Sequence, residues 1–126
     1  MFDLPQIMRT AQDMARHAAA RQTVIAENIA HSDTPGYKAK DLPDFGNFFS
    51  ASHPLRATRA GHIGADLRAL EFKAETDAGS PSFSPNGNTV SLEREMIRSA
   101  ETRQGHDLAL AVYGSTRGIL RSALGR

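Results

Sequence analysis

The sequence predicts a mainly α-helical protein in which long N- and C-terminal helices pair as a coiled-coil-like hairpin around a small irregular or extended middle lobe. Apolar residues recur at helical spacing near both ends of the chain. The middle is rich in Gly, Ser and Pro and has no sustained period. We therefore expect an N-terminal helix in 1–33, a turn and irregular segment in 34–87, and a C-terminal helix in 88–126.

The first helix is expected to begin near Leu4 and to end between Ala30 and Asp33. Pro5 suits a first helical turn, where its missing N–H costs nothing, and Asp3 can cap that turn. An apolar seam at alternating spacings of four and three faces a partner helix. The seam comprises Leu4, Met8, Ala11, Ala15, Ala18, Gln22, Ile25 and Ile29, and Gln22 is its one polar member.

A sharp corner is expected after this helix. Pro35 biases Thr34 away from the helical region, so the helix cannot continue. Pro35 and Gly36 suit a type II turn, in which Pro fixes φ at the second position and Gly supplies a positive φ at the third. The turn aims Tyr37 and Lys38 in a defined direction.

The middle segment has one strong apolar anchor, formed by Phe45, Phe48 and Phe49. We expect this cluster to dock the loop back onto the helices, with a binding hot spot as the alternative. Short extended pieces are possible at 57–63 and 70–73.

The C-terminal helix is expected from about Thr89 to Leu124, with Asn88 or Ser91 as its N-cap. Three glycines interrupt it, which indicates either close helix approach or a compliant helix, and we favour close packing between subunits. Its apolar residues cover too wide an arc for one partner helix: Leu92, Met96, Ile97, Ala100, Leu108, Leu110, Ala111, Tyr113, Ile119, Leu120 and Leu124.

Composition and motifs argue against several classes of function. A net charge of +1 gives no electrostatic footprint for nucleic acid, and no apolar run reaches transmembrane length, so we expect no direct membrane insertion. The histidines are scattered, cysteine is absent, and Asp41 and Asp44 are expected to be solvated. We expect no catalytic residues, no metal and no cofactor. The N-terminus also lacks the pattern of a cleavable secretory signal.

Two stretches resemble signatures of one protein family. Asn28 to Ala30, followed by Asp-Thr-Pro-Gly-Tyr-Lys at 33–38, resembles the N-terminal signature of the flagellar axial proteins, which form rod, hook and hook-associated structures. Ser84 to Met96 resembles the second signature of the proximal rod proteins. Two departures are His31, where the family usually has Asn, and Asn86, where Asp is commoner.

The resemblance implies a structural subunit of the flagellar basal-body rod that self-assembles in the periplasm after export without a cleaved signal peptide. Implied partners are other rod proteins, the adaptor joining rod to basal ring, and the flagellar export apparatus. A helical module that binds one partner through its amphipathic helix stays open as the alternative. The expected assembly residues are Ile25, Asn28, Ile29, Ala30, Thr34, Pro35, Gly36, Tyr37, Gly87, Asn88, Val90, Leu92, Glu95 and Met96.

Overall fold

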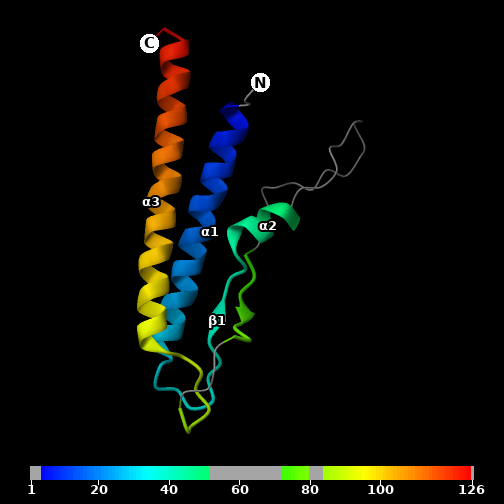
Figure 1. The fold of residues 1–126 in the computed structure, drawn as a ribbon, viewed down its shortest axis with the longest axis vertical. Helices are drawn as coiled ribbons and strands as arrows, with labels where there is room; N and C mark the ends of the chain where they lie inside the picture. Colours follow the sequence, from blue (N-terminus) through cyan, green and yellow to red (C-terminus); the bar gives the residue numbers. More distant parts are fainter. Residues whose placement is uncertain (1–3, 52–71, 80–83, 126) are drawn as a thin grey trace.

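Two long helices lie side by side and antiparallel in the computed structural model, which describes residues 4–51, 72–79 and 84–125 (Figure 1). The first, α1, spans Leu4–Ala30, and the second, α3, spans Leu92–Ala123. The predicted mainly helical fold with paired terminal helices is confirmed. A small lobe flanks one end of the pair and contains β1 (Lys40–Asp41), α2 (Phe45–Ala51) and β2 (Glu75–Thr76).

The predicted seam of α1 faces α3. Ala11, Ala18 and Ile25 are buried, and Ile25 is only 1% exposed. Gln22 also belongs to this face, because its Nε2 donates a hydrogen bond to Ser99 Oγ on α3 at 2.9 Å. Small alanines give the helices little apolar area to bury, so polar contacts contribute to the pairing as well.

The face of α3 that meets α1 is mainly polar. Its buried residues recur every seven positions as Glu95, Thr102, Ala109 and Thr116. Most large apolar residues of α3, and Leu124 just after it, are instead exposed: Leu92, Met96, Ile97, Leu108, Leu110, Val112, Ile119 and Leu124. The prediction that one partner helix would leave much of this arc uncovered is therefore confirmed.

The start of α3 differs from the prediction. The helix begins at Leu92 rather than Thr89, and Ser91 is the N-cap, with Oγ accepting from Arg94 N. Asn88 is occupied elsewhere, since its amide caps the end of α1. Thr89 is extended: its N–H donates to Tyr37 O at 3.0 Å, and its Oγ1 accepts from Ala39 N at 2.8 Å.

The lobe contains short regular elements that periodicity did not predict. β1 and β2 pair antiparallel, with Lys40 opposite Thr76. The expected docking of the phenylalanine cluster is confirmed: Phe45 and Phe48 of α2 lie against the buried ring of His17 on α1. The extended piece expected at 57–63 lies outside the described residues, as do positions 70–71 of the piece expected at 70–73. Residues 72–73 are described and form no strand, and β2 begins only at Glu75.

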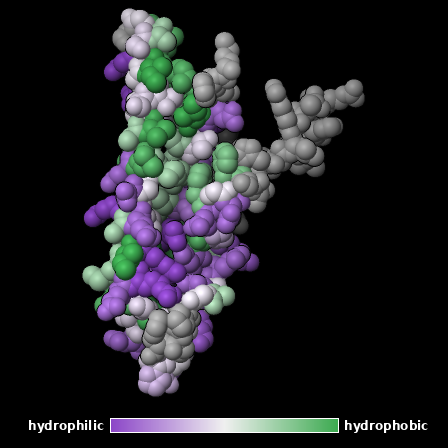
Figure 2. All heavy atoms as spheres, in the orientation of Figure 1, coloured by the Kyte–Doolittle hydropathy of each residue, from purple (hydrophilic) through white to green (hydrophobic). Residues whose placement is uncertain are grey.

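Polar side chains concentrate where the helix pair meets the β1–β2 ribbon, whereas apolar ones gather towards the opposite end of the pair (Figure 2). This distribution of side chains arises because the seam of α1 buries little apolar area and because the face of α3 that meets α1 is polar. The ribbon end is therefore where specific polar contacts fix the geometry.

Ile25→Ala is expected to lower the free energy of unfolding by about 2–4 kcal/mol, because it removes buried methyl groups from the seam and leaves a cavity. The matched control Ile97→Ala, at a solvent-facing site, should change it by less than about 0.5 kcal/mol. Urea denaturation followed by circular dichroism measures both. Equal losses in the two variants would contradict this packing.

Candidate functional site

The fully buried side chain of Asn28 joins α1, β1 and α3 at the ribbon end of the helix pair. Its Nδ2 donates to Lys40 O at 2.7 Å and to Glu95 Oε2 at 3.1 Å. Its Oδ1 accepts from Lys40 N at 3.0 Å and from the Tyr37 hydroxyl at 3.4 Å. The amide thus pairs with the peptide groups of Lys40 as a neighbouring strand would, and all its hydrogen-bonding capacity is used.

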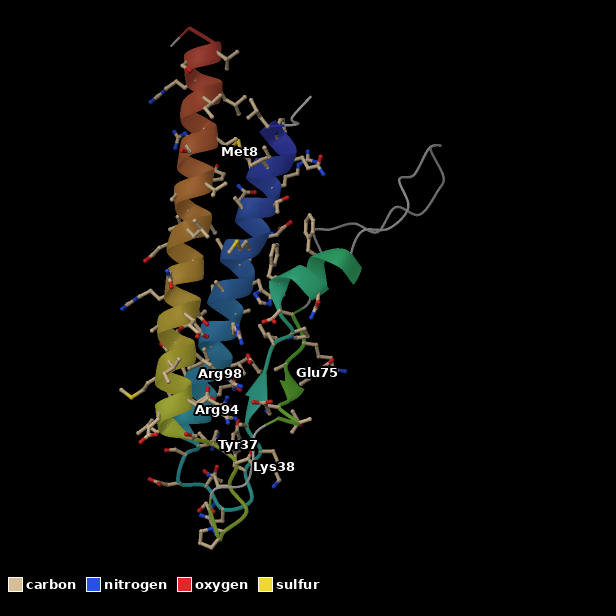
Figure 3. All side chains as sticks on the ribbon, in the orientation of Figure 1. Met8, Tyr37, Lys38, Glu75, Arg94 and Arg98 are labelled. Carbon is tan, nitrogen blue, oxygen red and sulfur yellow. The ribbon has the colours of Figure 1, made fainter. Side chains whose placement is uncertain are left out.

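A charged cluster extends from Glu95 across the ribbon. Glu95 is 1% exposed and pairs with Arg98, whose guanidinium also contacts Asp77 at 2.6 Å. Arg21 of α1 binds Asp41 with two hydrogen bonds, at 2.8 and 2.7 Å. Arg98 lies between α3 and the ribbon in Figure 3. Arg21 therefore links α1 to β1, and Arg98 links α3 to Asp77, the residue that follows β2.

These contacts alter the acidity of the groups. Partial burial by itself raises the pKa of Asp41, but the hydrogen bonds and positive charge of Arg21 outweigh it, so the pKa lies below its ordinary value. Burial lowers the pKa of Arg98, while Asp77, Asp41 and Glu95 raise it, and the net shift is upward. Both shifts favour the ionised forms of Asp41 and Arg98.

Asn88 performs a second bridging role, at the C-terminus of α1. Its Nδ2 lies 2.8–2.9 Å from the carbonyl oxygens of His31, Ser32 and Thr34, which follow the last helical turn. Its Oδ1 accepts from Val90 N at 2.8 Å. Because Asn88 precedes α3 and satisfies carbonyls beyond α1, it joins the exit of one helix to the entry of the other.

Two turns pack against each other beside Asn88. Tyr37 N donates to Thr34 O, and Gly36 has φ +72°, as the predicted type II turn requires. Gly87 N donates to Ser84 O across a second turn, and Gly36 N donates to Asn86 O. A Cβ on Gly87 would lie 3.7 Å from Gly36 Cα. The two signature stretches thus meet backbone to backbone.

The aromatic pair at this corner is formed by His31 and Tyr37. Their rings stack with centroids 4.5 Å apart, and His31 Nδ1 lies 3.1 Å from Thr34 Oγ1. Burial, helped by the negative charges of Glu27 and Glu95, raises the pKa of Tyr37. The hydroxyl of Tyr37 therefore remains a donor to Asn28.

The predicted assembly residues fall into three groups. Ile25, Asn28, Asn88 and Glu95 are buried within the chain. Leu92 and Met96 are 50% and 63% exposed and offer apolar surface to a partner. The others line the corner or its flanks with partial or full exposure: Ile29, Ala30, Thr34, Pro35, Gly36, Tyr37, Gly87 and Val90. Participation of all these residues in assembly stays a prediction.

Sequence reasoning missed the ion pairs. The expectation that Asp41 is solvated was wrong, because the chain returns along α1 and brings Asp41 to Arg21. Asp44, in contrast, is 78% exposed. The spacing of Glu95 and Arg98 by three positions was an available signal for one pair. Nothing in the sequence indicated the partners of Arg21 or Asp77.

Other chemistry has little support in the described part of the chain. No group of three or more His, Cys, Asp or Glu side chains there could hold a metal ion. None of its helices is both long enough and apolar enough to cross a bilayer.

Known proteins resemble the chain over most of its length, and three relatives from different bacteria each bear the name flagellar basal body rod protein FlgB. The protein of Cereibacter sphaeroides (strain ATCC 17029 / ATH 2.4.9) is 36% identical over 108 residues, which cover 82% of each chain. That of Bacillus subtilis is 31% identical over 76% of this chain and 75% of its own. That of Salmonella typhimurium is 29% identical over 89% of this chain and 88% of its own. No protein-family model matches the chain.

Asn28→Asp is expected to destabilise the protein by roughly 3 kcal/mol or more at pH 7, because it places a buried carboxylate against Glu95 and Lys40 O. Urea denaturation at pH 7 measures it. Adding Glu95→Gln should recover part of the loss, and Asn47→Asp, at an exposed site, should change little. Equal effects of Asn28→Asp and Asn47→Asp would contradict the assignment.

Asp41→Asn is expected to lower stability at pH 7 but not in strong acid. The folded-state pKa of Asp41 is depressed, so its contribution is present above the ordinary value of 3.8 and is lost as pH falls through the lower folded value. The wild type and the variant should therefore converge at low pH in denaturant unfolding. Asp44→Asn, at the exposed neighbour, is the control. A stability difference between the wild type and Asp41→Asn that stays constant with pH would show that the ionised carboxylate of Asp41 is not its cause.

Proposed function

Because the chain belongs to the FlgB family of flagellar basal body rod proteins and is a structural, non-enzymatic rod subunit, we propose that it builds the proximal part of the rod by self-assembly. The observation that carries this proposal is the distribution of polar and apolar side chains around α3. Its inner face is polar, and its large apolar side chains remain exposed when the chain has folded. Such a surface is typical of a protein whose packing is completed by neighbours.

The ribbon end gives this subunit a fixed shape. Asn28, Glu95 and Asn88 hold the two helices and the lobe together through hydrogen bonds that have few alternatives once buried. A shaft that transmits torque requires subunits that keep their shape under load. The polar cluster suits that requirement, while the exposed apolar positions supply contacts between subunits.

We further propose where the subunit acts and what it meets. It is exported without a cleaved signal peptide by the flagellar export apparatus and assembles in the periplasmic part of the basal body. Its neighbours there are copies of itself, other rod proteins and the adaptor that joins the rod to the basal ring. The family supports assembly with rod components, and the apolar surface of α3 supports more than one neighbour.

The direct test is to delete the chromosomal copy and restore the chain with an epitope tag. Swimming should be lost on deletion and regained on restoration, and the tagged chain should purify with basal bodies that retain the rod. A restored swimmer whose basal bodies lack the chain would refute the proposal.

Gly36→Val is expected to abolish swimming and incorporation into basal bodies. A β-branched residue is strained at φ +72°, so the chain beyond the corner would leave in another direction. The control Gly46→Val lies in α2, without a positive φ and with no atom near its Cβ position, and should swim normally. Soft-agar swimming and immunoblots of basal bodies measure both, and normal incorporation of Gly36→Val would show that the corner is dispensable.

A further inference from the structure

The turn that precedes α3 has the sequence Ser-Pro-Asn-Gly at 84–87, the one place in the chain where glycine follows asparagine. The other asparagines, Asn28, Asn47 and Asn88, precede Ile, Phe and Thr. A main-chain nitrogen can attack the side-chain amide carbon of the asparagine before it, and glycine has no Cβ to obstruct the approach. Asn86 is exposed, so water also reaches it.

The reaction open to this pair is deamidation through a cyclic imide. Gly87 N forms a bond to Asn86 Cγ, the bond from Cγ to Nδ2 breaks, and ammonia leaves with the proton that Gly87 N gives up. Water then opens the imide in one of two ways. Hydrolysis of the bond from Gly87 N to Cγ leaves an aspartyl residue at position 86. Hydrolysis of the bond from Gly87 N to the main-chain carbonyl carbon leaves an isoaspartyl residue, in which the main chain runs through the former side chain.

Hydrogen bonds within the turn hold the atoms that would react. Gly87 N donates to Ser84 O at 3.0 Å. Asn86 Oδ1 accepts from Asn88 N at 3.1 Å, an arrangement that asparagine often adopts in turns. The nitrogen of the imide carries no hydrogen, so the bond from Gly87 N to Ser84 O is lost when the ring closes. The folded turn therefore opposes the first step of deamidation.

The corner after α1 holds this turn in place from the other side. Asn86 O accepts from Gly36 N at 3.0 Å, and Gly87 O accepts from Lys38 Nζ at 3.0 Å. The two turns lie next to each other beyond the end of the helix pair (Figure 1). Asn86 O belongs to the same peptide group as Gly87 N, so rotating this group to bring the nitrogen to Cγ also breaks the contact with Gly36. Ring closure thus requires the two turns to separate.

We propose that Asn86 is a site of spontaneous deamidation, protected once the two turns have met and reactive whenever they are apart. The rate in the folded chain is then the rate in the open chain multiplied by the small fraction of molecules whose corner is open. Loss of ammonia at position 86 is therefore restricted to chains in which the corner has not formed or has opened.

The two products affect the corner differently. An aspartyl side chain keeps an oxygen that accepts from Asn88 N, and its charge strengthens that hydrogen bond. An isoaspartyl residue instead adds one carbon to the main chain between Ser84 and Gly87. The carbonyl that accepts from Gly36 N then becomes a carboxylate outside the main chain. The aspartyl form should therefore close the corner, and the isoaspartyl form should not.

Peptide mass spectrometry of the purified full-length chain tests the site. The chain is incubated at mildly alkaline pH, which favours attack by the nitrogen, in buffer and in guanidinium chloride. The mass gain from amide to acid is followed at each asparagine. In guanidinium chloride, position 86 should react much faster than positions 28, 47 and 88. Folding in buffer should slow position 86 by at least about tenfold, because local opening limits the reaction.

Two variants separate the corner from other effects of folding. Asn88→Ala removes the hydrogen bonds from Asn88 Nδ2 to the carbonyls of His31, Ser32 and Thr34 but leaves the Asn-Gly pair intact. Its position 86 should therefore react in buffer at a rate close to that in guanidinium chloride. Asn47→Ala, at an exposed site on α2, is the matched control and should keep the slow rate.

The outcomes that would overturn the proposal are distinct. Equal rates at position 86 in buffer and in guanidinium chloride, or a slow Asn88→Ala, would show that the corner gives no protection. Equal rates at all four asparagines in guanidinium chloride would eliminate the site itself.

The products are compared by denaturant unfolding. Asn86→Asp, which reproduces the aspartyl product, should unfold at the midpoint of the wild type. The isoaspartyl chain, separated from the aspartyl chain by ion-exchange chromatography, should unfold at a lower denaturant concentration. An isoaspartyl chain as stable as Asn86→Asp would contradict the predicted loss of the corner.

Discussion

The buried amide of Asn28 is the interaction on which the rest of the structure depends. Among the described residues, it hydrogen-bonds to the backbone of β1, to Glu95 on α3 and to Tyr37 in the corner at the same time. A buried amide with two donors and one acceptor oxygen has few satisfactory arrangements, so it fixes the relative position of these elements. Glu95 then requires Arg98, and Arg98 brings in Asp77 next to the ribbon.

The helix pair is accordingly held in two different ways along its length. At the ribbon end, charged and amide groups form a satisfied network around a mostly buried centre. Away from it, the pairing relies on alanines and on a polar face of α3, which bury little apolar area. The relative position of the two helices is thus fixed at the ribbon end. The remaining length of α3 keeps its large apolar residues free for contacts with neighbouring subunits.

The polar inner face and the exposed apolar residues of α3 explain how a rod subunit can be well folded and still leave apolar surface for neighbouring subunits to cover. A helix with a polar inner face gains little from its intramolecular partner, whereas packing against additional helices buries Ile97, Leu108 and Leu110 without closing another loop. Contacts with neighbouring subunits would therefore cover apolar surface that the folded chain leaves exposed.

The sequence by itself determined the fold class, the limits of α1, the positive φ of Gly36 and the excess of apolar surface on α3, because helical periodicity and Pro-Gly turn chemistry are local properties. It also indicated the family, through residues that turn out to meet at one corner. Only the tertiary structure decided that Asn88 caps α1 rather than α3, that Glu95 is buried, and that Asp41 binds Arg21. Those outcomes depend on which carbonyls and charges the returning chain brings within hydrogen-bonding distance, and residues separated by 20 or more positions carry no local signal of their contact.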